Sequence, residues 1–153
     1  MALFHRIVQE RWSATAMDGE GARRYGGRWN SPGLPAVYLA ESRALAALEI
    51  LVHAPREALL LSWIVIGMEI PDDWLETASP ADLPPNWRAQ PSSSAAQAYG
   101  SEWLRSGRGV ALVLPSVVIP EEHSLLVNPL HPRMSELKPE KPKPFSFDPR
   151  LSV

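Results

Sequence analysis

One acidic side chain, Glu49, lies where a carboxylate is costly. It belongs to SRALAALEILVH, residues 42–53, whose apolar residues cover nearly the whole circumference at helical spacing. A helix of this kind is typically buried, and a buried carboxylate is unfavourable unless it is paired or put to use. We interpret Glu49 as a catalytic or substrate-orienting acid. The alternative is a structural ion pair with an arginine.

A second candidate is the loop RRYGGRWNSPG, residues 23–33. The consecutive Gly26 and Gly27 allow a backbone to approach a ligand closely or to adopt a positive φ. Arg28, Trp29 and Asn30 follow at once, and such a loop can bind an anion and stack a flat ring. It has neither the GKS or GKT of a P-loop nor a GxGxxG turn. The alternative is an ordered surface loop with a packed tryptophan.

Three further polar residues have a functional and a structural interpretation. Ser116 follows the apolar strand GVALVL without a GxSxG elbow, so it is either a turn residue or a ligand-binding hydroxyl, not a hydrolase nucleophile. Asn128 precedes Pro129 and is either a turn residue or a polar ligand contact. His53 shares a helix face with Glu49, but we favour a satisfied core or helix C-terminal histidine.

Composition narrows the class of protein. The chain has 153 residues, no cysteine and a formal charge of −2. Without cysteine, a Cys-based zinc site, a disulfide scaffold and a thiol nucleophile are excluded. Near-neutral charge argues against a protein held on nucleic acid by phosphate contacts. No apolar run approaches the ~20 residues of a membrane span, and the N-terminus lacks a signal-peptide pattern. We therefore expect a cytoplasmic domain that binds neither membrane nor nucleic acid directly.

Arginine is in excess. The chain has 12 Arg and 3 Lys, and five of the Arg lie in the first 28 residues. The guanidinium fork suits carboxylates and phosphates. The alternative explanation is codon usage in a GC-rich genome.

The elements that must position these residues are mixed, and we expect an α+β fold in which strands dominate. Strands are expected at Leu3–Val8, Ala36–Ala40, Leu59–Ile70, Gly109–Leu114, Val117–Ile119 and Ser124–Asn128. Helices are expected from Ser42, a capping residue, to about His53 and at Ser94–Arg105, with irregular stretches at Ser13–Pro35 and Ala78–Pro91. The Pro-rich tail, residues 138–153, should be extended, and its end is pinned only if Phe145, Phe147 and Leu151 find a groove.

Four stretches carry a resemblance to a known family: Arg6 in the first strand, GGRWNSPGLPAVYLAESRALAALEILVH, LPSVVIP, and the ending LVNPLHP with FSFDPRL. They resemble the RES-domain family, the toxins of RES–Xre toxin–antitoxin modules. The resemblance covers essentially the whole chain, residues 1–153, as a single domain. Only Pro71–Arg105 contains no recognisable motif.

The resemblance implies a fold similar to that of the ADP-ribosyltransferase toxins and the consumption of NAD⁺. It identifies Arg28, Tyr38 and Glu49 as catalytic residues. It also implies that the pocket is lined at Arg6, Arg28, Tyr38, Ser116 and Asn128. Two arginines can clamp a pyrophosphate. One carboxylate is sufficient to stabilise an oxocarbenium-like ribose, because the nicotinamide cation leaves without a general acid. No metal is expected.

The resemblance leaves the acceptor of the ADP-ribosyl group open. Water or phosphate makes the protein an NAD⁺ glycohydrolase or phosphorylase, and a protein acceptor makes it an ADP-ribosyltransferase. A catalytically silent binding module is a third alternative. The resemblance also implies an Xre-type helix-turn-helix antitoxin as partner, and a toxin dimer within that complex.

Overall fold

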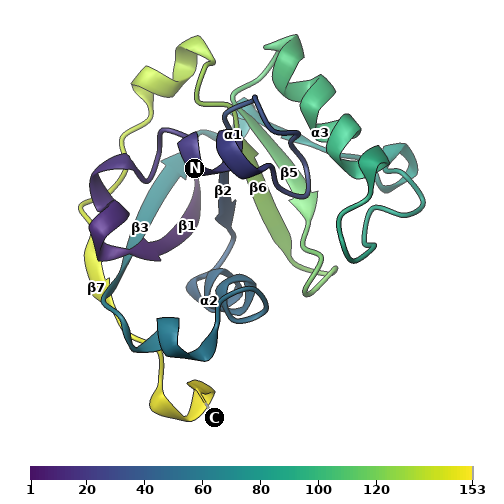
Figure 1. The fold of residues 1–153 in the computed structure, drawn as a ribbon. Coiled ribbons are helices and arrows are strands. Elements are labelled where there is room, and N and C mark those ends of the chain that lie inside the picture. The colour runs from purple at the N-terminus through teal and green to yellow at the C-terminus, as the bar shows by residue number, and fades with distance from the viewer. Residues whose placement is uncertain (153) are drawn as a thin grey trace.

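A seven-stranded mixed sheet forms the centre of the computed structural model, which describes residues 1–152 (Figure 1). Its strands are β1 (Ala2–Gln9), β2 (Val37–Ala40), β3 (Trp63–Ile70), β4 (Leu75–Thr77), β5 (Ala111–Pro115), β6 (His123–Val127) and β7 (Lys143–Phe145). Their order in the sheet is β4-β5-β6-β2-β1-β3-β7. β4 pairs with β5 in parallel, and the other pairs are antiparallel. The expected α+β class is confirmed.

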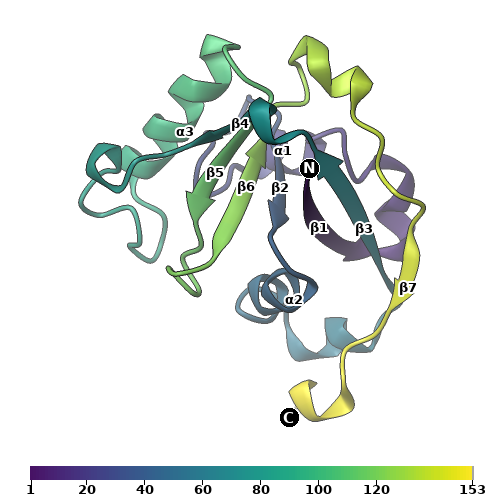
Figure 2. The same ribbon diagram turned by 180° about the vertical axis from the view of Figure 1, so that it is seen from behind.

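Three α-helices accompany the sheet within the described residues: α1 (Glu20–Tyr25), α2 (Arg43–Leu51) and α3 (Ser94–Ser106). Helix α2 begins as expected, since the Ser42 hydroxyl accepts the Leu45 N–H at 3.0 Å. In both ribbon views α2 lies below the point where the β1–β3 half of the sheet diverges from the β5–β6 half (Figures 1 and 2). Helix α3 runs beside β5 and β6.

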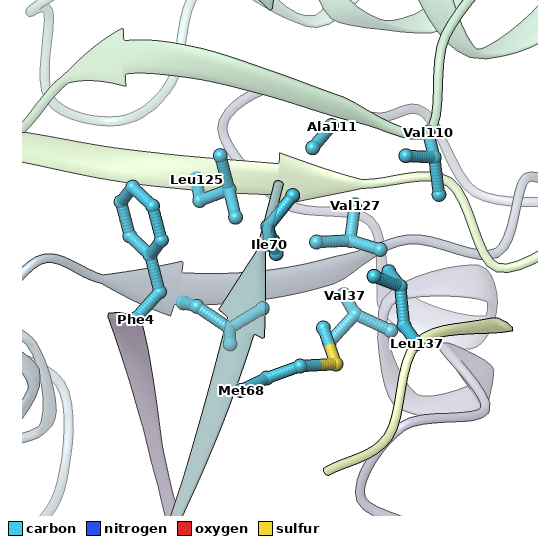
Figure 3. Close-up of a cluster of buried hydrophobic side chains, with 10 residues drawn as sticks. Phe4, Val37, Met68, Ile70, Val110, Ala111, Leu125, Val127 and Leu137 are labelled. Atoms are coloured by element: carbon cyan, nitrogen blue, oxygen red, sulfur yellow. The ribbon is translucent and has the colours of Figure 1, made fainter. Parts of the chain in front are cut away.

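Alternation along the strands divides the core between two faces of the sheet. Val37 and Leu39 of β2 point to one face, where they pack with residues of β1, β3, β5 and β6 and with Leu137 (Figure 3). Tyr38 packs on the other face with Leu126 and the aromatic side of α3. Ala40, further along that same face, packs with α2. The predicted functional tyrosine thus projects onto the face that carries both helices.

Several expected elements differ from the structure. The strand expected at Leu59–Ile70 begins only at Trp63, because a 3₁₀ helix occupies Arg56–Leu60. The segment Val117–Ile119 is not a strand. The irregular stretch Ser13–Pro35 contains α1, and a 3₁₀ helix at Glu10–Thr15 overlaps its beginning. The short apolar runs at 59–61 and 117–119 have no periodicity that distinguishes a strand from a turn of helix.

Helix α2 is less buried than its composition predicts. Only Leu45 and Ala46 are buried, and Val52, just beyond its end, is 58% exposed. The helix packs one side against β1 and β2 and leaves the other side open. Glu49 is consequently half-buried instead of fully enclosed.

The C-terminal tail is held on the sheet. Phe145 ends β7, which pairs with β3, and Phe147 is buried with its ring 5.5 Å from that of Trp63. Leu151 remains 49% exposed, so two of the three expected anchors find a groove. Within residues 1–152, no helix is both long enough and apolar enough to cross a membrane.

Candidate functional site

A carboxylate and a hydroxyl from distant parts of the chain meet at the end of β5. The Ser116 Oγ donates a hydrogen bond to Oε1 of Glu49 at 2.8 Å. The same Oγ accepts the backbone N–H groups of Val118 at 3.1 Å and Ile119 at 3.3 Å. Ser116 is 1% exposed, so its own position is fixed by packing and by these bonds. The buried serine therefore holds the Glu49 carboxylate in one orientation.

The alternative interpretation of Glu49, a structural ion pair, is not what the structure contains. Glu49 takes part in none of the ion pairs formed within residues 1–152. Its one side-chain hydrogen bond in that part of the chain comes from Ser116. A carboxylate can accept about four hydrogen bonds, so most of its capacity stays available to a ligand.

Arg28 is oriented by a loop that carried no recognisable motif. Its Nη1 donates to the carbonyl oxygens of Trp87 at 2.9 Å and Ala89 at 2.8 Å. Both hydrogens of Nη1 are thereby used. The Nε–Nη2 edge, which suits a bidentate contact with an anion, makes no hydrogen bond within residues 1–152.

Burial and the Glu49 carboxylate shift the pKa of Arg28 in opposite directions. Burial lowers the pKa of the Arg28 guanidinium, and the nearby Glu49 carboxylate opposes that shift. Arginine keeps its proton in proteins even after such a shift. The site therefore combines the Arg28 cation and the Glu49 carboxylate, which interact electrostatically without direct contact in an ion pair.

Tyr38 contributes a ring to the site, while its hydroxyl is occupied. The hydroxyl donates to Asn30 Oδ1 at 2.5 Å and accepts the backbone N–H of Trp29 at 3.1 Å. Burial raises the pKa of the Tyr38 phenol well above its ordinary value, with smaller opposing effects from Trp29 and Arg28. The phenol is thus neutral at physiological pH and unsuited to acid–base catalysis there.

A cavity of about 450 Å³ adjoins these residues and is lined by Val52, His53, Gln90, Val117 and Val118. Its walls are direct neighbours of the site. His53 lies one turn beyond Glu49, Val117 follows Ser116, and Gln90 follows the carbonyl that holds Arg28. The volume is within the usual range for small-molecule sites.

Of the two structural alternatives for His53, the core histidine is wrong, and the position next to the helix C-terminus is what the structure shows. It is exposed just beyond the end of α2 and faces the cavity. Helix α2 ends at Leu51, two residues earlier than its apolar pattern predicts, and this releases His53 from the packed face.

Arg6 serves the framework of the fold. Its Nε donates to the carbonyl of Ala16 at 2.9 Å and its Nη1 to the carbonyl of Tyr38 at 3.1 Å. Alternation along β1 directs Arg6 away from the face of Ile7, which packs with α2. Burial lowers the pKa of the Arg6 guanidinium, and Asp18 opposes the shift. Arg6 thus links β1 to β2 and to the segment that follows β1.

Asn128 lies at the opposite end of β6 from Ser116. Pro115 pairs with His123, and Asn128 is five residues further on, roughly 17 Å at the rise of a strand. Its amide donates to the carbonyl of Leu104, and its Oδ1 accepts the N–H of Leu130. The structure therefore brings together Arg28, Tyr38, Glu49 and Ser116 and places Asn128 apart from them.

The backbone carbonyls that hold Arg28 left no signal in the sequence, and Asn30 left a weak one. Trp87 and Ala89 act through backbone carbonyls, which any residue type supplies. Asn30 is 0% exposed and bonded to Tyr38, although only its place in GGRWN pointed to it. Within residues 1–152 no group of three or more His, Cys, Asp or Glu is arranged to hold a metal ion.

Comparison with known proteins finds matches over nearly the whole chain. The model of the RES domain family matches residues 3–148. A Prs ADP-ribosylating toxin from Sphingobium sp. is 41% identical, with 97% of this chain and 95% of the relative aligned. A Toxin Res from Yersinia enterocolitica is also 41% identical, over 97% of this chain and 99% of the relative.

A solved structure shares the fold. The Mycobacterium tuberculosis MbcT–MbcA toxin–antitoxin complex contains a chain that superposes with a TM-score of 0.77 at 22% identity, over 99% of this chain and 86% of that one. A 36-residue segment of M. tuberculosis NAD(+) phosphorylase MbcT, 19% of that protein, is 58% identical to 23% of this chain. The family model matches residues 3–148 and two relatives are 41% identical over nearly their full length, so the chain belongs to the RES-domain family.

Proposed function

We propose that this chain is the toxin of a toxin–antitoxin pair and consumes NAD⁺ by breaking the nicotinamide–ribose bond. The observation that carries the proposal is the Glu49 carboxylate, held by Ser116 beside a cavity of about 450 Å³. Arg28, which is close enough to Glu49 for their charges to interact, keeps an unused Nε–Nη2 edge. The names of the relatives, an ADP-ribosylating toxin and an NAD(+) phosphorylase, support this substrate.

Arg28 binds the substrate in this scheme. Its unused edge matches two oxygens of a pyrophosphate, and charge-assisted bonds of this kind are strong and directional. The ring of Tyr38 offers a flat surface for nicotinamide. The hydrogen bonds that Arg6 and Asn128 donate within residues 1–152 go to backbone carbonyls, and Asn128 lies apart from the other site residues, so we assign both to the framework of the pocket.

Glu49 then acts on the ribose. When the C1′–N bond breaks, its electron pair goes to nicotinamide, which leaves as a neutral molecule and needs no proton. Positive charge develops on the ribose, as in glycoside hydrolysis, and the fixed carboxylate stabilises it. The acceptor oxygen bonds to C1′ and releases its proton.

Two acceptor classes have support. Hydrolysis or phosphorolysis is our first proposal, in line with the name of MbcT. Transfer of ADP-ribose to a protein is the second, favoured by the name of the Sphingobium relative, which is similar over nearly the whole chain. Both reactions share the Arg28, Tyr38, Glu49 and Ser116 site.

The partner we propose is an antitoxin of the Xre helix-turn-helix class, with two toxin chains in the complex and the reaction in the cytoplasm. The solved toxin–antitoxin complex of similar fold supports an antitoxin partner. The DNA contacts would then belong to the antitoxin, which suits a toxin chain with a net charge of −2.

The test is incubation of the purified protein with NAD⁺ labelled in its adenylate phosphate, with and without Glu49→Gln. The glutamine keeps an oxygen for the Ser116 hydroxyl, so the variant should fold normally. Loss of the fixed negative charge should slow nicotinamide release by about 100-fold or more. Glu57→Gln, on the exposed 3₁₀ helix after α2, is the matched control and should keep full activity.

The products separate the proposals. Free ADP-ribose or its phosphate supports hydrolysis or phosphorolysis, and label on a protein acceptor supports transfer. Intact NAD⁺ after long incubation would overturn the proposed function and favour a silent binding module. Full activity of Glu49→Gln would overturn the catalytic role proposed for Glu49.

A further inference from the structure

The hydroxyl of Tyr38 is fully engaged inside the protein. It donates to Asn30 Oδ1 at 2.5 Å and accepts the Trp29 N–H at 3.1 Å. A tyrosine hydroxyl has a single hydrogen to donate. It therefore cannot also donate to a bound ligand unless it releases Asn30. Its bonds point to a role within the protein.

Asn30 links this hydroxyl to three parts of the chain. It is 0% exposed, and its Nδ2 donates to the carbonyls of Ala22 at 2.9 Å and Leu34 at 3.1 Å. One amide thus joins α1, the segment before β2 and β2 itself. A buried amide satisfied on both its oxygen and its nitrogen is costly to disturb.

Gly27 shows how closely the backbone approaches this pair. A Cβ at Gly27 would lie 2.7 Å from the Tyr38 hydroxyl and 2.9 Å from Asn30 Oδ1, so any larger residue would collide with both. The Gly27 N–H also donates to the Asn30 carbonyl at 2.9 Å. The residue before Arg28 is therefore held by the backbone carbonyl of Asn30, whose side chain is anchored to Tyr38, and the residue after it, Trp29, is bonded to the Tyr38 hydroxyl.

We infer that Asn30 and the Tyr38 hydroxyl are positioning groups for the NAD⁺ reaction: they fix the backbone on both sides of Arg28 and so hold its free edge in place for the substrate. This inference rests on the proposed function of Arg28. It gives Tyr38 two separate roles: its ring is available to substrate, and its hydroxyl holds the loop that carries Arg28. Catalysis depends on Asn30 without Asn30 touching NAD⁺.

A double-mutant cycle tests the pair. Tyr38→Phe removes only the hydroxyl, Asn30→Ala removes its partner, and the third variant combines both. Because the pair sets the binding arginine and not the carboxylate, each change should raise the KM for NAD⁺ by about 10-fold or more, with a smaller effect on kcat. The double variant should lose less than the two single losses combined, because both changes break the bond between Tyr38 and Asn30.

Tyr99→Phe is the matched control. Tyr99 packs edge-on against Trp29 at 6.0 Å between ring centroids, and its hydroxyl makes no hydrogen bond within residues 1–152. This variant should keep the wild-type KM. Independent, additive losses from Tyr38→Phe and Asn30→Ala would overturn the inference, as would an unchanged KM in Tyr38→Phe.

A second measurement does not depend on activity. Hydrogen exchange at the Trp29 backbone amide should become faster in Tyr38→Phe and remain slow in Tyr99→Phe and in Arg28→Lys. If the wild type consumes no NAD⁺, the proposed function fails, while this exchange still reports on the link itself. If the wild type is active and exchange in Tyr38→Phe stays slow, the positioning role fails and the proposed function stands.

Discussion

At the scale of single residues, the side chains of the site are each held by hydrogen bonds within the protein and keep part of their bonding capacity free for a ligand. Ser116 gives its only proton to Glu49 and accepts two backbone N–H groups. Arg28 commits one nitrogen to two carbonyls and keeps an edge free. Such groups lose little freedom when a substrate binds, and this pre-organisation favours catalysis.

Ser116→Ala should therefore reduce both activity and stability. The backbone N–H groups of Val118 and Ile119 would lose their acceptor in a buried place, which typically costs about 1–3 kcal/mol. Glu49 would also lose the bond that orients it. Urea unfolding should show the lower free energy, and nicotinamide release should be slower while the variant is still fully folded.

The matched control for this prediction is Ser135→Ala, whose exposed hydroxyl caps only a local 3₁₀ turn. Its free energy of unfolding and its activity should stay close to the wild type. A Ser116→Ala protein with wild-type turnover would show that Glu49 is oriented by something other than this hydroxyl.

At the scale of elements, α3 clamps the loop that carries Arg28. Gln97 donates to the carbonyl of Gly27 at 3.0 Å, and the Ser101 hydroxyl accepts the Ser31 N–H at 2.9 Å. Between them, Gly100 lies against the backbone of Trp29, where an added Cβ would overlap the Trp29 carbonyl. The helix can approach the loop this closely only because residue 100 has no side chain.

Gly100→Ala should destabilise the protein although alanine favours helices. The gain in helix propensity is about 1 kcal/mol, but backbone overlap forces the helix and the loop apart. We expect a net loss of about 2 kcal/mol in the free energy of unfolding and a higher KM for NAD⁺, because Arg28 moves with the loop.

Gly21→Ala is the control for this change. Gly21 lies in α1 with nothing near the position of a Cβ, so alanine there should stabilise by about 0.5–1 kcal/mol. Thermal or urea unfolding of the two variants compares them directly. Equal stability of the two would contradict the close approach of α3 to Trp29.

At the scale of the whole molecule, the two halves of the sheet meet where β1 pairs with β2. One buried histidine lies at that junction. His5 of β1 pairs with Ala40 of β2, is 5% exposed, and its Nδ1 has no hydrogen-bond partner within residues 1–152. Burial lowers the pKa of His5, Arg43 lowers it further, and Glu140 partly opposes the shift.

This lowered pKa predicts an acid-sensitive fold. The unfolded chain takes up a proton at His5 near pH 6.5, where the folded chain does not, so stability is full above that pH and falls as the pH drops below it. His5→Leu should reduce the stability that is lost between pH 7 and pH 5. Urea unfolding at both pH values measures the difference, and an equal loss in both proteins would contradict the prediction.

The sequence by itself predicted the candidate residues of the site and most of the elements around it. Glu49 was predicted because a carboxylate in an apolar helix is costly, and Arg28 because of the unusual GGRWN loop and its resemblance to the family motif. The strands β1, β2 and β6 and the helices α2 and α3 followed from apolar runs and from their caps. These are local signals, since burial pattern and capping depend on residues close in the chain.

Only the tertiary structure decided which of these residues work together. Ser116 meets Glu49 across 67 positions, and Arg28 meets the carbonyl of Ala89 across 61. Asn128 turned out to support α3, and Arg6 to tie β1 to β2. Contacts of this kind depend on how strands pair and how helices pack on them, and backbone carbonyls carry no residue-type signal at all. The residue types thus specify what the site can do, and the packing specifies which atoms do it.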